Sequence, residues 1–367
     1  MIYNVILSMY HRIIIKVGTK VLTDQDGSIN EQIIKNLVSQ IATLRQQGTQ
    51  VVLVSSGAVG AGRASMKRSS ASKDPLGDKQ VYAAVGQSFL MGLYTRYMTV
   101  HGITPAQILV TKEDFRDRTH YNNMQTCLEN IFSRDIVPIV NENDVIAVKE
   151  LFFTDNDELA GLLALQLDVD AVFFLTSVDG IIKNLQEGSG DIVSNISADE
   201  LADVERYVTA DKSNTGRGGM RSKFMTARKL MAAGITVYLQ NGTVKEGVLR
   251  RLNGEAFGTR FTPRKKISAR KRKIAHGDDS LARGSVTVNK RLETQLISAD
   301  KARSLLPVGI TKVDGDFVAG DLIIIKGEDN NVLGCGLAKY GAASVKQSIG
   351  LKGGRAIIHY DDLFLFG

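Results

Sequence analysis

Carboxylates and amides gather at the end of a short apolar run in the middle of the chain. Val137–Val140 is apolar, Asn141–Asp144 follows it with the sequence Asn-Glu-Asn-Asp, and Asp155–Asp157 adds two carboxylates and an amide. Such a run is typical of a buried parallel strand, and ligands of open α/β sheets bind outside the carboxyl ends of the strands. These side chains therefore suit a substrate that carries an amine or a metal-bound phosphate. The alternative is a polar loop in which Asn and Asp only cap helices.

Two further strand ends carry residues that suit an anion. Ile13–Ile15 runs into Lys16 and Gly18, where the lysine can project from the sheet and the glycine lets the backbone approach a phosphate. Val54–Gly62 is rich in small residues, which expose backbone N–H groups at a helix N-terminus. Simpler interpretations stay open: a solvent-exposed lysine at a strand end, and glycines that only allow close packing.

A glycine-rich, basic loop precedes the predicted helix Phe224–Ala233. Residues 214–223 contain three glycines and three cations, which suits a triphosphate, although a mobile surface loop is the alternative. The apolar run Phe173–Leu175 ends in Thr176 and Ser177, which can border the same nucleotide.

Together these groups suit phosphoryl transfer. Two lysines from different elements, glycine-rich backbone donors and an aspartate can position a transferring phosphoryl group and neutralise its charge. A substrate carboxylate is ionised at neutral pH and needs no general base. This agrees with the five histidines, which are scattered outside these motifs. The sequence contains no G-x-x-x-x-G-K-[ST], which argues against a P-loop kinase.

The elements that must position these residues alternate along the first 250 residues. Apolar runs separated by segments of helical length predict βαβ units and a parallel sheet. The predicted strands are Ile13–Ile15, Val51–Val54, Ala106–Val110, Ile136–Val140, Ala171–Leu175 and Ile235–Leu239. Glu31–Gln46 and Lys79–Met98 place apolar side chains near one helix face. The stripe of the second helix, expected to be core, consists of Val81, Val85, Phe89 and Leu93.

The character of the chain changes after about residue 274. The apolar runs become short and are separated by tight turns such as Asp314–Asp316 and Ala319–Asp321, which predicts a small, mostly β domain. We expect domains at residues 1–258 and 274–367, joined by a basic linker at residues 259–273.

The composition is that of a globular protein, with 43% hydrophobic and 23% charged residues. The net charge of +7 is local: Arg260–Lys273 holds eight cations and no acid, so the rest of the chain sums to −1. Such a run can track nucleic-acid phosphates, but it is more often a solvated linker. Cys127 and Cys335 match no metal spacing and are interpreted as free thiols of a cytoplasmic protein. We expect neither a signal peptide nor a membrane span.

Six motifs, in order, resemble those of the amino acid kinase family. They are Lys16–Thr19, Ser55–Ala58, Ala83–Gln87, Asn141–Asp144, Asp155–Asp157 and Gly218–Lys223. The tail, with Ser304–Ile310 and Gly315–Asp321, is similar to the PUA domain of bacterial members that phosphorylate glutamate. Each motif alone is modest, but the ordered set covers essentially the whole chain and is highly specific.

The resemblance implies an α/β fold, namely an open, mainly parallel αβα sandwich followed by a small, mostly β PUA domain. It implies ATP-dependent phosphorylation of the side-chain carboxylate of L-glutamate to L-glutamyl 5-phosphate, the first step of proline biosynthesis. Mg²⁺ would be carried on the ATP phosphates, with no metal ligand expected from the protein.

By position in the motifs, the resemblance implies three catalytic residues: Lys16 and Lys223 on the ATP phosphates, and Asp157 orienting both lysines. The residues that would hold glutamate are Ser56, Asp144 and Asn156, with the Asp144 carboxylate on the α-ammonium. The residues that would line ATP are Lys16, Gly18, Thr176, Ser177, Arg217, Gly218, Gly219, Met220 and Lys223.

The chain departs from the family pattern at Ser177, where Asp is common, at Arg217, where Thr is common, and over Arg63–Asp78, which in the family helps to bind glutamate and inhibitory proline. The implied partners are glutamate, proline as a feedback inhibitor, a second copy of the chain in a homo-oligomer and a glutamyl-phosphate reductase. Neither nucleic acid nor a membrane is expected. Two alternatives stay open: an RNA-binding PUA protein with the kinase domain as scaffold, and an acyl kinase for aspartate, acetylglutamate or carbamate.

Overall fold

The computed structural model describes residues 10–66, 74–147, 153, 155–183, 190–210, 219–263, 274, 282–297 and 303–366. The chain forms two compact units. The first ends at residue 264 and the second begins at residue 265, with the short segment Ala232–Gly234 grouped with the second. Residues 264–273 of the predicted basic linker lie outside the described residues.

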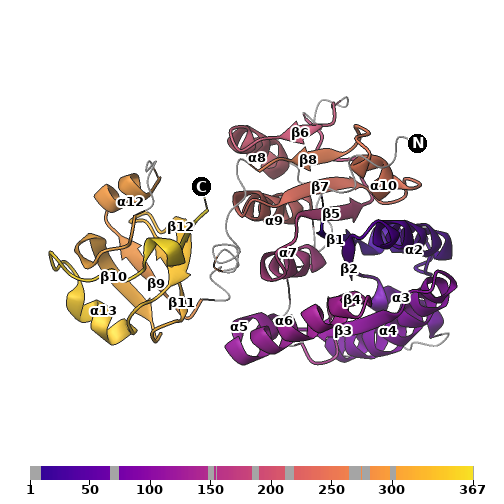
Figure 1. Ribbon diagram of the computed structural model, residues 1–367, viewed down its shortest axis with the longest axis horizontal. Helices are drawn as coiled ribbons and strands as arrows, with labels where there is room; N and C mark the ends of the chain where they lie inside the picture. Colours follow the sequence, from indigo (N-terminus) through magenta and orange to yellow (C-terminus); the bar gives the residue numbers. More distant parts are fainter. Residues whose placement is uncertain are drawn as a thin grey trace. The chain divides into compact units, whose positions relative to one another are not determined.

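The first unit is built on an eight-stranded sheet with the strand order β3-β4-β2-β1-β5-β7-β8-β6 (Figure 1). The pairs are parallel except β7 with β8, which confirms the open, mainly parallel sheet. The strands are β1 (Arg12–Val17), β2 (Gln50–Val54), β3 (Pro105–Val110), β4 (Val137–Glu142), β5 (Ala171–Thr176), β6 (Asn195–Ile196), β7 (Thr236–Asn241) and β8 (Thr259–Phe261).

Helices cover both faces of this sheet (Figure 1). They are α1 (Thr19–Leu22), α2 (Glu31–Gln46), α3 (Ala58–Ser65), α4 (Pro75–Val100), α5 (Lys112–Arg116), α6 (Arg118–Ser133), α7 (Asn156–Gln166), α8 (Leu201–Ala210), α9 (Met220–Ala232) and α10 (Gly247–Leu252). Ile13 and Ile15 pack with α2, α4 and α10 in one core cluster. Successive strand residues point to opposite faces, so Ile14 and Lys16 face the other layer, where α7 contacts β1 and β5.

Short polar side chains cap the N-terminal ends of three helices in this unit. Asn30 accepts the N–H groups of Gln32 and Ile33 at the start of α2, and Asp74 does the same for α4, with Pro75 in its first turn. Asp155 caps α7. The local sequence therefore sets where these three helices begin.

Helices α3 and α4 pack in close contact through glycines. A Cβ on Gly62 would lie 1.9 Å from the Tyr82 carbonyl oxygen, and one on Gly86 would lie 1.8 Å from the Ala58 carbonyl oxygen. Only residues without a Cβ allow the two backbones to approach this closely. Gly86 belongs to the Ala83–Gln87 motif, so part of that motif has a packing function.

The prediction that the apolar stripe of α4 is buried is largely wrong. Val81, Val85 and Phe89 are 50%, 40% and 46% exposed, and only Leu93 is buried. The buried side of the helix instead carries small and polar residues near its start, because α3 lies against Gly86. The result is an exposed apolar stripe on α4.

The second unit is a five-stranded sheet with the order β10-β9-β11-β12-β13, which confirms the predicted small, mostly β domain. Its elements are β9 (Gly284–Val288), α12 (Lys290–Ile297), β10 (Ile310–Gly315), β11 (Leu322–Lys326), β12 (Val332–Leu337), α13 (Ala342–Ser348) and β13 (Leu363–Leu365). Gly315 and Gly320 have φ of 86° and 93°, as the predicted turns require. The unit has its own apolar core, which includes Val286, Ile323 and Phe317. None of the helices in the described part of the chain is both long and apolar enough to span a membrane.

Candidate active site

Two lysines from distant parts of the sequence meet one buried carboxylate. Lys16 Nζ lies 2.7 Å from Asp157 Oδ1, and Lys223 Nζ lies 2.8 Å from Asp157 Oδ2. The Asp157 side chain is completely buried, and those of Lys16 and Lys223 are only 7% and 10% exposed. The cluster holds two positive charges and one negative charge. Its excess positive charge, in a region of low exposure, suits an anion.

Three elements bring this cluster together at the carboxyl edge of the sheet. Lys16 is near the end of β1, on the face that α7 covers, and Asp157 is in the first turn of α7. Lys223 is in the first turn of α9. Because β1 lies between β2 and β5, the cluster has strand ends on both sides from which further side chains can reach it.

A chain of amides and hydroxyls lies next to the charged cluster. Asn156 Nδ2 donates to Ser56 Oγ at 3.1 Å and to Asn141 Oδ1 at 2.9 Å. Asn141 Nδ2 in turn donates to Gln87 Oε1 at 3.0 Å. These bonds fix which end of each amide faces the neighbouring group. Two of the predicted glutamate residues, Ser56 and Asn156, are thus brought together.

The third predicted glutamate residue, Asp144, forms an ion pair. Lys79 Nζ lies 2.5 Å from Asp144 Oδ1, and the adjacent Gln80 Nε2 donates to the Val145 carbonyl oxygen at 2.8 Å. Asp144 comes from the loop that follows β4, three residues beyond Asn141.

The carboxylate beside the cluster is also perturbed. Burial raises the pKa of the Asp155 carboxyl above its ordinary value, and the charge of Asp157 adds to the rise. A hydrogen bond from the Ser222 side chain and one from the Glu158 backbone act in the opposite direction.

The predicted nucleotide residues lie at the ends of β1 and β5 and at the start of α9. Gly18 donates its N–H to the Leu175 carbonyl oxygen at 3.1 Å, and a Cβ there would lie 3.8 Å from Lys16 Nζ. The backbone N–H of Gly18 is therefore already used within the protein, and the contribution of this glycine is the space that it leaves beside the Lys16 ammonium. Thr176 is a buried strand end, and Ser177 is exposed.

Gly219 and Met220 lie directly at the start of α9, the helix whose first turn holds Lys223. The predicted ATP residues Arg217 and Gly218 lie outside the described residues.

Sequence reasoning placed Asn141 in the polar group that suits a substrate but gave it no individual role, and it assigned no site role to Gln87 or Lys79. Gln87 stood in the motif Ala83–Gln87, and that motif was its signal in the sequence. Lys79 carried no such signal, because its partner Asp144 is 65 residues away.

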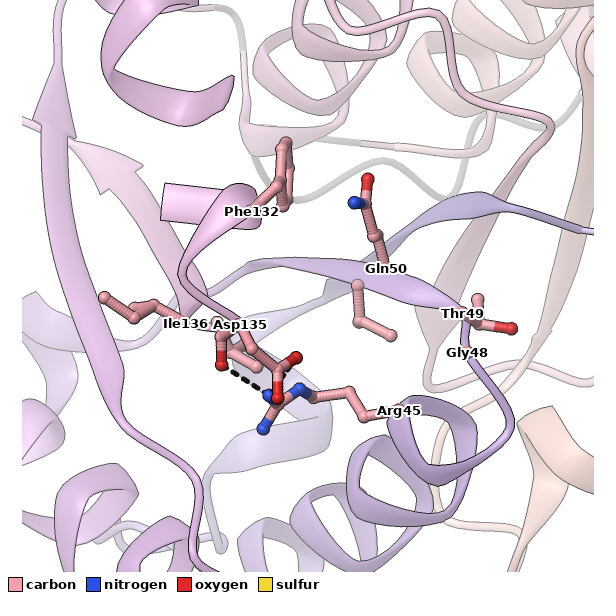
Figure 2. Close-up of a pocket in the computed structure, with 9 residues that line it drawn as sticks. Arg45, Gly48, Thr49, Gln50, Phe132, Asp135 and Ile136 are labelled. Carbon is pink, nitrogen blue, oxygen red and sulfur yellow. Dashed lines mark hydrogen bonds and ion pairs between the residues drawn. The ribbon is translucent and has the colours of Figure 1, made fainter. Parts of the chain in front are cut away.

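A cavity of about 160 Å³ lies elsewhere in this unit (Figure 2). It is lined by Gln50 and Val137, the first residues of β2 and β4, and is therefore at the amino-terminal edge of the sheet. Arg45 and Asp135 form an ion pair within it (Figure 2). All the polar groups of the candidate site are at the opposite edge.

An open parallel sheet with cations and amides at its carboxyl edge is typical of nucleotide-using α/β enzymes. The amino acid kinase family model matches residues 11–241, and the PUA domain model matches residues 284–358. The chain belongs to the amino acid kinase family.

Curated relatives extend this likeness over the full length. The glutamate 5-kinase of Chlorobaculum tepidum is 45% identical over 97% of this chain and 98% of its own length. That of Bacteroides thetaiotaomicron is 37% identical over 97% of this chain and 99% of its own. Among solved structures, carbamate kinase from Giardia lamblia bound to AMP-PNP is 20% identical. It covers 70% of this chain and 99% of its own, with a TM-score of 0.51, and so shares the fold.

Proposed function

We propose that this chain transfers the terminal phosphoryl group of ATP to the side-chain carboxylate of L-glutamate, giving L-glutamyl 5-phosphate and ADP. The observation that carries the proposal is the convergence of Lys16 and Lys223 on Asp157. The glutamate 5-kinases, similar to this chain over nearly their whole length, support the choice of substrate.

The reaction asks little covalent chemistry of the protein. An oxygen of the ionised carboxylate forms a bond to the γ-phosphorus while the bond between that phosphorus and the β–γ bridging oxygen breaks, and ADP keeps the electron pair. No proton has to be removed from the nucleophile. Lys16 and Lys223 would stabilise charge on the transferring group, and Asp157 would hold both ammonium groups in place.

The donor set fits a nucleoside triphosphate. The cluster carries a net positive charge, Gly18 leaves room beside the Lys16 ammonium, and the N-terminal end of α9 favours an anion. The nucleotide would be lined by Thr176, Ser177, Arg217, Gly218, Gly219 and Met220.

Magnesium would enter with the nucleotide. In the part of the chain that the structure describes, no three His, Cys, Asp or Glu side chains gather as metal ligands. Phosphate oxygens of ATP would hold Mg²⁺, which keeps several waters in such complexes. The ion would neutralise phosphate charge together with the two lysines.

Glutamate would bind on the side of β2 and β4. Ser56 and Asn156 offer a hydroxyl and an amide that are joined by a hydrogen bond, and Asn141 accepts a second one from the Asn156 amide. Asp144 offers a carboxylate for the α-ammonium.

An ATP-dependent hydroxamate assay tests the proposal, because hydroxylamine traps the acyl phosphate. Glutamate, aspartate and acetylglutamate should be compared at equal concentration, and glutamate is expected to be used best. Preferred use of aspartate or acetylglutamate would favour the related acyl kinase, and no ATP-dependent product with any of the three would contradict the proposed glutamate kinase. Adding proline to the same assay tests the predicted feedback inhibition.

We also propose that the protein is a cytoplasmic homo-oligomer that delivers its product to a glutamyl-phosphate reductase. The exposed stripe of Val81, Val85 and Phe89 supports self-association, because pairing two copies would remove it from water. Phe89→Glu should lower the sedimentation coefficient. A single-copy particle of the unmodified chain would contradict self-association.

A further inference from the structure

We propose that Lys79 and Asp144 act together on the zwitterionic head of the substrate, with Lys79 binding the α-carboxylate. The inference rests on the proposed glutamate kinase activity and deepens it, because it names the substrate groups that the site requires. Lys79 Nζ and Asp144 Oδ1 lie 2.5 Å apart, and their side chains are 27% and 12% exposed. Solvent, and hence a ligand, reaches both partners.

The pair is carried by the same two elements that orient the amide network. Helix α4 supplies both Lys79 and Gln87, and the segment from the end of β4 supplies both Asp144 and Asn141. Gln87 contacts Asn141 and Lys79 contacts Asp144, so α4 and this segment meet twice. Any ligand that lies against Asn156 and Asp144 therefore approaches α4.

The charges of the pair match those of a free amino acid. The head of an α-amino acid carries an ammonium and a carboxylate on one carbon. Asp144 suits the ammonium, but it would repel the α-carboxylate if no cation stood beside it. Lys79 supplies this cation. A zwitterion docked against the ion pair places each charge next to its opposite and brings no net charge into the site.

A purely structural function is the competing explanation. In that case, the ion pair and the hydrogen bond from Gln80 to the Val145 carbonyl would hold the loop against α4 and would have no contact with the substrate. Such a tie would affect every substrate equally. Recognition of the α-carboxylate would affect only substrates that carry this charge.

Two glutamate analogues separate the charges of the head. Isoglutamine replaces the α-carboxylate with a neutral amide and keeps the side-chain carboxylate that is phosphorylated. 2-Hydroxyglutarate replaces the ammonium with a hydroxyl group. The kcat/KM of the full-length protein should be measured for glutamate and both analogues by the hydroxamate assay.

The variants are Lys79→Met, Lys79→Gln and Asp144→Asn, with Lys35→Met, an exposed lysine of α2, as the control. In Lys79→Met the preference for glutamate over isoglutamine should fall about 10- to 100-fold, the value of one charge-assisted hydrogen bond, while the preference over 2-hydroxyglutarate stays. Asp144→Asn should show the reverse pattern, and Lys35→Met should change neither preference.

Lys79→Gln separates the two explanations even if Lys79→Met folds poorly. Glutamine can still donate to Asp144 and tie the loop, but it has no charge. We expect it to lose the preference over isoglutamine as methionine does. An unchanged preference in Lys79→Gln, or an equal loss for all three substrates, would overturn the assignment of Lys79 alone. Failure of the unmodified protein to use glutamate would overturn the proposed function, and this inference with it.

Discussion

Asp157 is the residue on which the charged cluster depends. A fully buried carboxylate is costly unless it is paired, and here two ammonium groups lie within 2.8 Å of its oxygens. The Asp157 carboxylate also holds the two ammonium groups close together, because its negative charge offsets their mutual repulsion. The arrangement is therefore preorganised for a further anionic group before any substrate arrives.

Asp155 gives a pH-dependent prediction. Its pKa is raised in the folded chain, so the folded chain holds this proton more tightly than the unfolded chain. The contribution of Asp155 to the free energy of unfolding must then fall as the pH rises from the ordinary value of 3.8 through the raised pKa. Asp155→Asn cannot ionise but can still cap α7, so this fall should be missing from the variant.

Urea unfolding of both proteins from about pH 4 to about pH 8 measures this. The difference in the free energy of unfolding, variant minus parent, should grow with pH until Asp155 is ionised and then stay level. A difference that does not change with pH would show that the carboxyl titrates as it does in the unfolded chain.

At the scale of elements, the contact between α3 and α4 controls where the Ser56 loop lies. Gly86→Ala must push the helices apart and should lower the free energy of unfolding by about 1–3 kcal/mol. Because α3 begins two residues after Ser56, the KM for glutamate should rise as well. Urea unfolding and the hydroxamate assay give the two readouts.

Gly92 of the same helix is the matched control, because nothing lies within 4 Å of a Cβ placed there. Gly92→Ala should raise the free energy of unfolding by about 0.5–1 kcal/mol and leave the KM for glutamate unchanged. Equal effects of the two substitutions would mean that the α3–α4 contact is not tight.

Periodicity predicted the mainly parallel sheet through six of its strands and placed three helices, because strands that alternate with helical segments form βαβ units. The short strands β6 and β8 were not predicted. Periodicity predicted the wrong buried face for α4. Val81, Val85 and Phe89 form the more apolar stripe, yet Gly86 marks the side that another backbone approaches. The contact with α3 depends on a missing side chain, and hydrophobicity does not report that.

At the scale of the whole molecule, each unit has its own core. Ile13, Leu53 and Phe173 belong to the core of the first, and Val286 and Ile323 to that of the second. A chain that ends at residue 264 should therefore fold and keep most of its kinase activity, because it contains every described site residue. A soluble, folded truncation without activity in the hydroxamate assay would show that the second unit completes the site.

The site could be predicted in part. Lys16, Asp157 and Lys223 stood in separate motifs, and the structure places them in one cluster. The partner of Asp144 could not be found this way, since the 65-residue separation from Lys79 leaves no local pattern. Long-range ion pairs are set by how helices cross a sheet, and sequence spacing does not encode that crossing.

The most direct test of the central claim is the kcat of Lys223→Met at saturating ATP and glutamate, with Lys229→Met of the same helix as the control. If Lys223 stabilises charge on the transferring phosphoryl group, the kcat of the variant should fall about 10²- to 10³-fold in a protein that still folds. Its thermal midpoint should be lower than that of the parent, because the buried Asp157 loses one of its two partners. The control should keep its kcat. A folded Lys223→Met protein with a kcat close to that of the parent would contradict the account.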